Sequence, residues 1–398
     1  MKQCKRCLYT ENHPLHITFD DEGICSGCRV HEEKFTLDWG EREQKLRILL
    51  ESYRNTDGMS YDCIVPISGG RDSYYIVHVL KNIYGMNPLL VSYNKHYNTH
   101  VGIRNFQYLK TIFDCDTLQM VVQPQKVKKI TKATIKHLGS IYWHVLAGQS
   151  VFPVQCAVRF KIPLIIWGVH QGVDQVGMYS HTDEVEMTRR YRKEHDLMGY
   201  EAEDLLVLDS DLTQNDLIQY VYPHDKEIEK VGVRGIYLGN YIPWDTKKQH
   251  EEMIEKYGYE TLQQQRTFDS YNDVDCVHYS GLHDYIKYLK FGYAKATDHA
   301  CREIRWGRLS RDEALKLVSA YEGIVPSDTR YLLEWLEISE GELFSLLARF
   351  QKAVPKLPLT QYSAEPPKGC RFILTSSKVP SVKEEGYTLL EKGYIEAH

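Results

Sequence analysis

A strand, a glycine-rich turn and a helix near residue 70 constrain the fold of this chain more than any other feature. The apolar residues 64–67 lead into the sequence SGGRDS, residues 68–73, and a helical pattern continues to Gly85. Such a turn brings backbone N–H groups and the positive end of a helix dipole to one point, where a phosphate can bind. The stretch therefore predicts a phosphate-binding loop, although two adjacent glycines also occur in ordinary turns.

The pattern around and after this loop alternates between apolar runs and helical stretches. Residues 63–67, 88–93, 118–122 and 163–168 predict buried strands, and residues 235–241 predict one more. Strands that alternate with helices form a parallel sheet with helices on both faces. We therefore expect an α/β nucleotide-binding domain built on a parallel sheet.

The rest of the chain divides into segments of different character, and 398 residues are enough for several domains. Residues 1–35 are loop-rich and cysteine-rich, and residues 36–250 hold the α/β pattern. The strand signal fades after that, so residues 251–350 predict a helical region that binds the substrate. Residues 351–398 contain several prolines and predict an extended C-terminal arm.

Four cysteines lie in two pairs near the N-terminus, as CKRC and CSGC. Cys4, Cys7, Cys25 and Cys28 form the spacing C-x2-C-x17-C-x2-C. Two such pairs bring four thiolates to the tetrahedral geometry that zinc prefers, whereas the alternative is four unrelated buried thiols. The spacing predicts a structural zinc site, closed by four protein ligands.

The same region contains GICSG, residues 23–27, which also matches the G-x-C-x-G turn of glutamine-hydrolysing enzymes. That turn needs a strand before it and a helix after it within an established sheet. Only 22 residues precede Gly23, which is too few for such a sheet. We therefore interpret Cys25 as a metal ligand and expect no glutaminase within this chain.

Charge and hydropathy exclude some classes of protein. The formal net charge is −5, which gives no overall attraction for nucleic acid, although a local basic face stays possible. No apolar run is long enough to cross a bilayer, and the N-terminus lacks the apolar core of a signal peptide. We expect a cytoplasmic protein that binds neither nucleic acid nor membrane.

The SGGRDS loop resembles the PP-loop, S-G-G-x-D-S, of ATP pyrophosphatases that cleave ATP to AMP and pyrophosphate. Its glycines let backbone N–H groups close around phosphate oxygens, and its serines add hydroxyl donors. Asp72 is the candidate ligand for Mg²⁺, and Arg71 the candidate that neutralises pyrophosphate. In related folds the adenine lies near the end of the next strand, here residues 91–93. The residues assigned to ATP are Ser68, Gly69, Gly70, Arg71, Asp72, Ser73, Ser92 and Gly168.

The chain resembles, over nearly its whole length, the bacterial N-acetyl sugar amidotransferases of the PP-loop superfamily. Beyond the cysteines and SGGRDS, the resemblance rests on residues 101–109, 163–168, 187–200, 237–245 and, most specifically, 283–308. It implies conversion of an acetamido group into an acetamidino group on a nucleotide-linked or free sugar. Such sugars enter lipopolysaccharide or flagellar glycans. ATP would adenylate the amide oxygen, so that ammonia can displace it.

One helical stretch, TDHACREIR, carries the candidate chemistry for the acceptor. Asp298, Arg302 and Arg305 are spaced at i, i+4 and i+7, and His299 pairs with Glu303 beside them. Such a face suits an anionic sugar, with His299 as the proton acceptor for ammonia and Asp298 and Arg305 as further catalytic residues. The alternative is a solvated helix face held by salt bridges.

The remaining substrate residues follow from the resemblance, and one of them marks a departure from it. They are Arg302, Lys290, Tyr293, Trp244, Asp245 and His170. Where family members often carry Gly-Glu-Asn, this chain has GVHQG, residues 168–172, so His170 or Gln171 would replace those side chains and the sugar can differ. The basic stretch MTRRYRKEHD, residues 187–196, either contacts a phosphate or forms an exposed helix.

The resemblance also implies partners, and two other functions stay open. Ammonia would come from a separate glutaminase, with a barrel protein like that of histidine biosynthesis as a candidate channel. A PP-loop enzyme that thiolates or amidates tRNA is the alternative enzyme, and it would need a basic face and a second cysteine pair. Cys63, Cys115 and Cys156 are far apart in the sequence. A zinc-ribbon interaction protein would leave the SGGRDS loop without a purpose.

Overall fold

The centre of the molecule is a five-stranded parallel sheet. The computed structural model describes residues 2–96 and 98–351. The arm predicted for residues 351–398 therefore lies outside the described residues, except for residue 351. The strand order is β3-β2-β1-β4-β5. The strands are β1 (Cys63–Pro66), β2 (Pro88–Tyr93), β3 (Thr117–Met120), β4 (Leu164–Trp167) and β5 (Arg234–Tyr237). Every adjacent pair is parallel, which confirms the predicted α/β fold.

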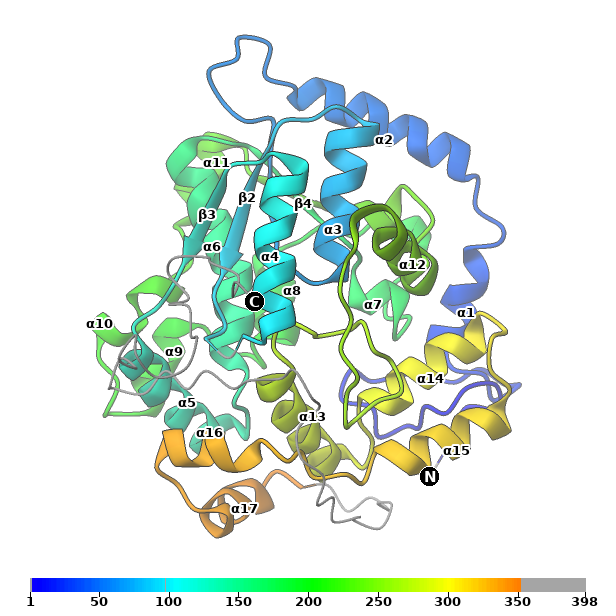
Figure 1. Ribbon diagram of the computed structural model, residues 1–398, viewed down its shortest axis with the longest axis vertical. Coiled ribbons are helices and arrows are strands. Elements are labelled where there is room, and N and C mark those ends of the chain that lie inside the picture. The colour runs from blue at the N-terminus through cyan, green and yellow to red at the C-terminus, as the bar shows by residue number, and fades with distance from the viewer. Residues whose placement is uncertain (1, 97, 352–398) are drawn as a thin grey trace.

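Helices cover both faces of this sheet, because successive strand residues point to opposite faces. Ile64 packs with residues of α6 (Trp143–Phe160), whereas its neighbour Val65 packs with residues of α3 (Arg71–Val77). Helices α4 (His100–Phe113) and α12 (Thr246–Tyr257) share the face of α3. Figure 1 shows α4 passing in front of the strands. Strands β1, β2 and β4 are therefore largely buried, as their continuous apolar runs predicted. The edge strand β3 is only partly buried, so the prediction of a buried strand is wrong there.

The other helices lie around this core. Those before β5 are α1 (Ser26–Glu33), α2 (Trp39–Tyr53), α5 (Pro124–Leu138), α7 (Gln171–Asp174), α8 (Arg189–Tyr191), α9 (Ala202–Leu208), α10 (Gln214–Leu217) and α11 (Asp225–Val231). Capping residues fix several helix ends. Helix α4 begins after the N-cap Thr99, whose hydroxyl accepts from the Gly102 N–H. Helix α5 ends at Gly139, which has a left-handed backbone conformation.

The region from Val277 to residue 351 is mainly helical, as its sequence predicted, whereas residues 258–276 contain no helix. It contains α13 (Val277–Phe291), α14 (Lys295–Arg305), α15 (Arg311–Tyr321), α16 (Thr329–Leu336) and α17 (Glu340–Ala348). Helices α13, α16 and α17 share a hydrophobic cluster with α5 and α6. Helices α14 and α15 instead pack on the cysteine-rich N-terminal segment. Figure 1 shows these two helices beside the start of the chain, although nearly 300 residues separate them in sequence.

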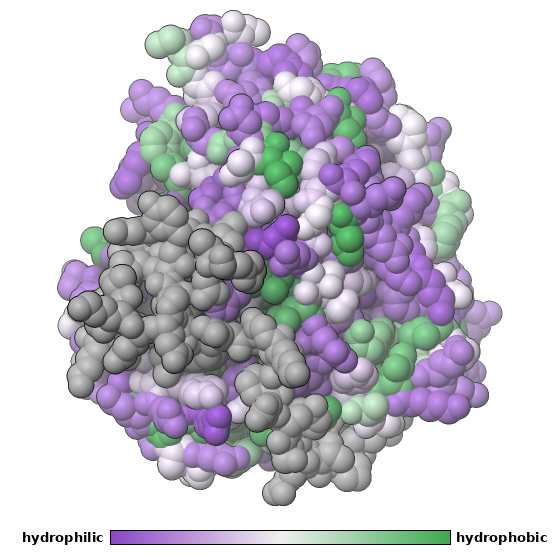
Figure 2. Space-filling model, viewed as in Figure 1, coloured by the Kyte–Doolittle hydropathy of each residue, from purple (hydrophilic) through white to green (hydrophobic). Residues whose placement is uncertain are grey.

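Within residues 2–96 and 98–351, no helix is long and apolar enough to cross a bilayer. On the face drawn in Figure 2, hydrophobic side chains form only small groups between hydrophilic ones. The apolar residues of the helices are instead directed into the shared hydrophobic clusters.

Candidate functional site

The predicted phosphate loop joins β1 to α3 at the carboxyl end of the sheet. Gly69 has φ +81°, and a Cβ built there would lie 2.9 Å from the Cβ of Phe106, so only glycine fits. The Ser68 hydroxyl accepts from the Gly70 N–H at 3.1 Å, and the Ser73 hydroxyl accepts from the Ser68 N–H at 3.0 Å. Gly70 begins α3 without a side-chain cap. The loop therefore has the strand–turn–helix geometry that the sequence predicted.

A cleft opens beside this loop at the ends of β1 and β2. Its lining includes Ser92, the residue assigned to the nucleotide, on the strand next to the loop. The side chains and backbone around the cleft come from the loop, from β2 and its extension, from α4 and from a distant segment near residue 275. They include Ser68, Ser92, Tyr93, Asn94, Lys95, Gly102, Phe106, Gln119 and Asp275. The cleft lies where an α/β sheet with a phosphate loop binds its nucleotide.

Two charged residues of the loop lie next to each other. The Arg71 guanidinium is 3.3 Å from the Asp72 carboxylate. The Asp72 side chain is about 40% exposed. Protein atoms nevertheless crowd its carboxylate, and this loss of solvent raises the pKa of Asp72. The nearby carboxylates of Asp174 and Asp273 raise this pKa further. Arg71 Nε is buried and has no hydrogen-bond partner among the described residues. The loop thus offers one carboxylate and one guanidinium that are only partly neutralised.

A segment from the helical region, residues 267–276, lies against the loop. Its Tyr271 ring lies 5.6 Å from the guanidinium carbons of both Arg71 and Arg302. Arg302 on α14 donates to Asp269 at 2.8 Å and to the Tyr271 hydroxyl at 2.9 Å. His250 stacks on the same ring at 4.1 Å. The predicted substrate residue Arg302 is therefore brought to the loop by this segment.

His299 contacts the same segment from α14. Its Nδ1 lies 2.7 Å from the Thr267 hydroxyl and 3.6 Å from the Asp269 carboxylate, and its Nε2 lies 3.2 Å from the Asn272 amide nitrogen. Burial lowers its pKa to about 4, so the ring is neutral at pH 7. Since the Asn272 NH₂ can only donate, Nε2 accepts and Nδ1 carries the proton.

Asp298 and Arg305 of α14, also predicted to be catalytic, have other neighbours than Arg302. Asp298 accepts from the Tyr9 hydroxyl at 2.8 Å and pairs with Lys287 at 2.5 Å. Arg305 donates to the Gln175 carbonyl at 2.6 Å and lies over the Tyr9 ring. Both side chains contact the cysteine-rich segment and its neighbours, and Arg305 Nε has no hydrogen-bond partner among the described residues. These contacts separate Asp298 and Arg305 from the contacts of Arg302, and a catalytic role for Asp298 and Arg305 stays a prediction.

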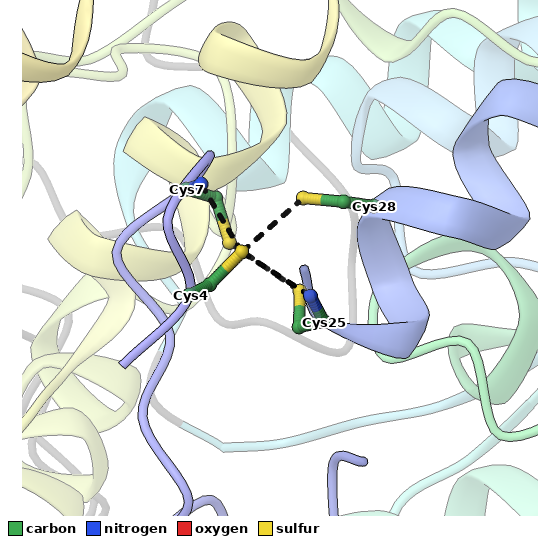
Figure 3. A group of neighbouring side chains, drawn as sticks. All are labelled: Cys4, Cys7, Cys25 and Cys28. Atoms are coloured by element: carbon green, nitrogen blue, oxygen red, sulfur yellow. Dashed lines mark hydrogen bonds between the residues drawn. The ribbon is translucent and has the colours of Figure 1, made fainter. Parts of the chain in front are cut away.

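The four predicted metal ligands lie together in the N-terminal segment (Figure 3). All four sulfur atoms are within 4.8 Å of one another and buried. The Cys4 sulfur accepts from three backbone N–H groups, those of Arg6, Cys7 and Cys25, at 3.3–3.4 Å. Amides that converge on a sulfur stabilise a thiolate, so the cluster could hold a metal ion.

The cluster also holds α14 and α15 in place. A fifth cysteine, Cys301 on α14, accepts from the Leu8 N–H at 3.3 Å. Arg305 Nη2 lies 4.0 Å from the Cys25 sulfur, and Arg311 of α15 donates to the Cys4 carbonyl at 2.8 Å. A Cβ on Gly27 would lie 2.4 Å from the Arg305 guanidinium. The sequence alone gave no signal for Cys301, because its partner lies 293 residues away.

Two predicted substrate residues lie away from the loop. Lys290 donates to the Leu138 and Gly139 carbonyls at 3.3 and 3.2 Å, where α5 ends, and burial lowers its pKa to about 8. Tyr293 is buried and stacks on His13 at 5.3 Å. Lys290 thus contacts the end of α5 and Tyr293 the cysteine-rich segment, so the structure does not bring these two residues to the phosphate loop.

Three more predicted residues serve local packing. Trp244 is 1% exposed. A Cβ built on Gly168 would lie 3.1 Å from the Trp244 ring, so Gly168 lets this ring pack closely against the end of β4. Asp245 accepts from the Lys248 N–H as the N-cap of α12 and pairs with Arg308. Trp244, Asp245 and Gly168 therefore lie in the core and at a helix end.

His170 lies at the end of β4 in an aromatic cluster. Its ring is 3% exposed and lies 4.2 Å from Tyr191 and 4.9 Å from Tyr237, and burial lowers its pKa to about 4. Neither ring nitrogen has a hydrogen-bond partner among the described residues. In the basic stretch nearby, Arg189 and Arg192 both pair with Glu201, which favours its interpretation as an ion-paired helix.

A comparison with known families identifies the segment that faces the loop. Residues 249–357 match the family described as LPS biosynthesis protein WbpG-like, C-terminal domain. This segment is similar to WbpG-like proteins. The resemblance expected from the sequence is confirmed there, and we call residues 249–357 the WbpG-like segment. Asp269, Tyr271, Asp275, His299 and Arg302 all belong to it, so it supplies the side of the candidate site opposite the phosphate loop.

Other relatives are more distant. An uncharacterized protein of Methanocaldococcus jannaschii is 26% identical over 103 residues, which are 26% of this chain and 36% of that protein. The match thus spans about a third of the relative's length.

Three solved structures share low likeness with this chain. The NH3-dependent NAD synthetase from Campylobacter jejuni has a TM-score of 0.29 and 14% identity, over 49% of this chain and 92% of its own. The NMN synthetase from Francisella tularensis has a TM-score of 0.27 and 12% identity, over 57% and 98%. The tRNA thiolase NcsA from Methanococcus maripaludis, solved with its iron–sulfur cluster, has a TM-score of 0.26 and 12% identity, over 89% and 99%.

Proposed function

We propose that this protein is an ATP-dependent amidotransferase of glycan biosynthesis, which converts an N-acetyl group of a bacterial surface sugar into an acetamidino group. The observation that carries the proposal is the contact between two parts of the chain. The SGGRDS loop, with the geometry of a phosphate site, lies against a segment similar to lipopolysaccharide biosynthesis proteins. ATP chemistry and sugar recognition would thus meet in one cleft.

The reaction uses ATP to turn a poor leaving group into a good one. The amide oxygen of the acetamido group attacks the α-phosphorus of ATP, and pyrophosphate leaves. Ammonia then attacks the amide carbon, and the oxygen leaves with AMP. The amide, ammonia and ATP thus become an amidine, AMP and pyrophosphate, with protons released to solvent.

The residues of the loop suit the first step. Backbone N–H groups at Gly69 and Gly70 would contact the phosphates, with the Ser68 and Ser73 hydroxyls beside them. Asp72 would hold the Mg²⁺ that accompanies ATP, and this cation neutralises the leaving pyrophosphate. Arg71, whose Nε has no partner among the described residues, would donate to the same charge.

Residues of α14 suit the second step. Arg302 would orient an anionic acceptor beside the loop, from its position against Tyr271. The neutral His299 would accept a proton at Nε2, in place of its hydrogen bond from Asn272, from the nitrogen that has just bonded to carbon. That nitrogen is more acidic than free ammonium. Ammonia would reach the site from a separate glutaminase, with a barrel-type protein as a candidate channel, and the enzyme would work in the cytoplasm.

The cysteine cluster would hold a structural zinc. Tetrahedral zinc with sulfur at about 2.3 Å requires sulfur atoms roughly 3.8 Å apart. The Cys4–Cys28 and Cys7–Cys25 sulfur pairs are 4.0 and 3.5 Å apart. With four cysteine ligands this zinc would stabilise the packing of α14 and would not activate water.

The experiment that tests this function measures AMP release by the purified chain with Mg²⁺–ATP and ammonium. N-acetylated nucleotide sugars and free N-acetyl sugars serve as acceptors, and bulk tRNA serves as the competing acceptor. We expect AMP and pyrophosphate to form only with an N-acetylated sugar. AMP formation that depends on tRNA instead would assign the protein to tRNA modification.

A further inference from the structure

One carboxylate of the WbpG-like segment lies inside the phosphate site. A Cβ built on Gly70 would lie 3.8 Å from Asp275 Oδ1, so this oxygen is next to the loop backbone. The backbone of the segment packs closely on α4, because a Cβ on Gly102 would lie 2.4 Å from the Asp275 Cα. Gly70 and Gly102 thus leave room for a residue that lies 205 and 173 positions further along the chain, respectively.

Several contacts fix Asp275 in this position. The Thr99 N–H donates to the Asp275 carbonyl at 3.2 Å, and the Thr99 hydroxyl donates to the Val274 carbonyl. Lys95, at the end of β2, donates to Asp275 Oδ2 at 2.8 Å. The Lys95 and Asp275 residues are 7% and 5% exposed. Although burial alone would lower it, the neighbouring carboxylate of Asp275 holds the pKa of Lys95 well above its ordinary value.

The second oxygen of the same carboxylate is free to bind a ligand. Asp275 lines the cleft that contains Ser68 and Ser92, and Oδ1 has no hydrogen-bond partner among the described residues. A carboxylate beside a phosphate site repels the phosphates unless a cation lies between them. Hard cations such as Mg²⁺ take carboxylate oxygens as ligands and usually bind to few protein groups when they accompany nucleotide phosphates.

We propose that Asp275 is a magnesium-binding residue of the ATP site, contributed by the WbpG-like segment. Oδ1 contacts the Mg²⁺ that accompanies ATP, and Lys95 holds the other oxygen so that the carboxylate cannot turn away. The proposal rests on the use of ATP by this protein. It makes the WbpG-like segment a part of the ATP site as well as of the acceptor site.

This role predicts opposite effects of one substitution with and without metal. Asp275→Asn keeps the shape of the side chain and the acceptor for Lys95, but it removes the charge. Mg²⁺–ATP should bind at least tenfold more weakly, because a ligand of the cation is lost. ATP in EDTA should bind as well as to the parent or more tightly, because the repulsion of the phosphates is gone.

The test is calorimetric titration of the full chain with an ATP analogue that has a methylene group between the α- and β-phosphates, with Mg²⁺ or with EDTA. Asp209→Asn is the matched control, because Asp209 is also 5% exposed and paired with a lysine, Lys136, but lies by α5. Its affinities should equal those of the parent. Urea unfolding shows whether each variant is folded, and Asp275→Ser replaces Asp275→Asn if the latter is not.

Three results would overturn the proposal. Unchanged binding of Mg²⁺–ATP would mean that Asp275 does not contact the cation. Equal weakening in Mg²⁺ and EDTA would mean that it only supports the fold of the loop. Tighter binding in both would mean that it only occupies the place of a phosphate. Failure of the parent to bind the analogue would instead refute the use of ATP.

Discussion

The substitution Gly69→Ala tests whether the loop is built for a phosphate. Gly69 has φ +81°, and the new Cβ would lie 2.9 Å from the Phe106 Cβ and 3.0 Å from its Cα. A left-handed conformation costs an L-residue about 1–2 kcal/mol. The contact with the backbone of α4 adds about 1–3 kcal/mol, because backbone atoms cannot move aside cheaply. We therefore expect Gly69→Ala to lower the free energy of unfolding by about 3 kcal/mol.

Gly85→Ala is the control, because Gly85 has φ +63° but no atom within 4 Å of the Cβ position. It should lower the free energy of unfolding by only about 1 kcal/mol. Urea titration measures both free energies, and calorimetry measures ATP binding. Gly69→Ala should bind ATP at least tenfold more weakly, whereas Gly85→Ala should bind it like the parent. If the two variants have equal stability and equal affinity for ATP, the account of the loop is wrong.

Three other predictions concern the metal, the loop and the pH. Elemental analysis of the reduced protein should find one zinc per chain, and a zinc content of the parent far below one would contradict this. Cys25→Ser should lower both zinc content and solubility, because metal binding and folding are coupled. Asp72→Ala should abolish AMP and pyrophosphate formation while changing the free energy of unfolding by less than about 1 kcal/mol, and ADP as a product of the parent would refute the assignment. Burial lowers the pKa of His96, His170, His250, His283 and His299 to about 4, so the unfolded chain binds more protons between pH 4 and 6.5. The free energy of unfolding should therefore rise with pH across that window, and a flat or falling profile in urea titrations would contradict it.

The sheet and the loop could be predicted because their signals are local. Residues 63–67 and 88–93 are continuous apolar runs, which parallel strands need when both faces are buried. The loop follows directly from its strand, and its glycines meet the steric limits set by Phe106. The paired cysteines likewise carry their spacing in the sequence. The sequence signal of each strand, of the loop and of each cysteine pair lies within a few consecutive positions.

The acceptor side could be predicted only in part, because α14 packs on two sides. Helical spacing placed Asp298, Arg302 and Arg305 on one face. The structure divides that face, since Tyr9 contacts both Asp298 and Arg305, while Tyr271 contacts Arg302. No periodicity in the sequence specifies which neighbour a long side chain reaches.

The contribution of Asp275 could not be predicted at all. Its partner Lys95 lies 180 residues earlier, and the pair forms only when the WbpG-like segment packs on the sheet. In the sequence, Asp275 is one of several aspartates within residues 267–276, and no local pattern distinguishes it from Asp269 or Asp273. The structure distinguishes them by their partners, since Asp269 pairs with Arg302 and Asp273 with Lys295.

The most direct test of the central claim follows the oxygen of the acetamido group. An N-acetylated sugar labelled with oxygen-18 in its acetyl carbonyl is incubated with the protein, Mg²⁺–ATP and ammonium, and the AMP is analysed by mass spectrometry. Adenylation of the amide oxygen predicts AMP that is about two mass units heavier, together with a sugar product about one mass unit lighter than the unlabelled acceptor, because oxygen is exchanged for NH. Unlabelled AMP, with the label retained in the sugar, would contradict the account.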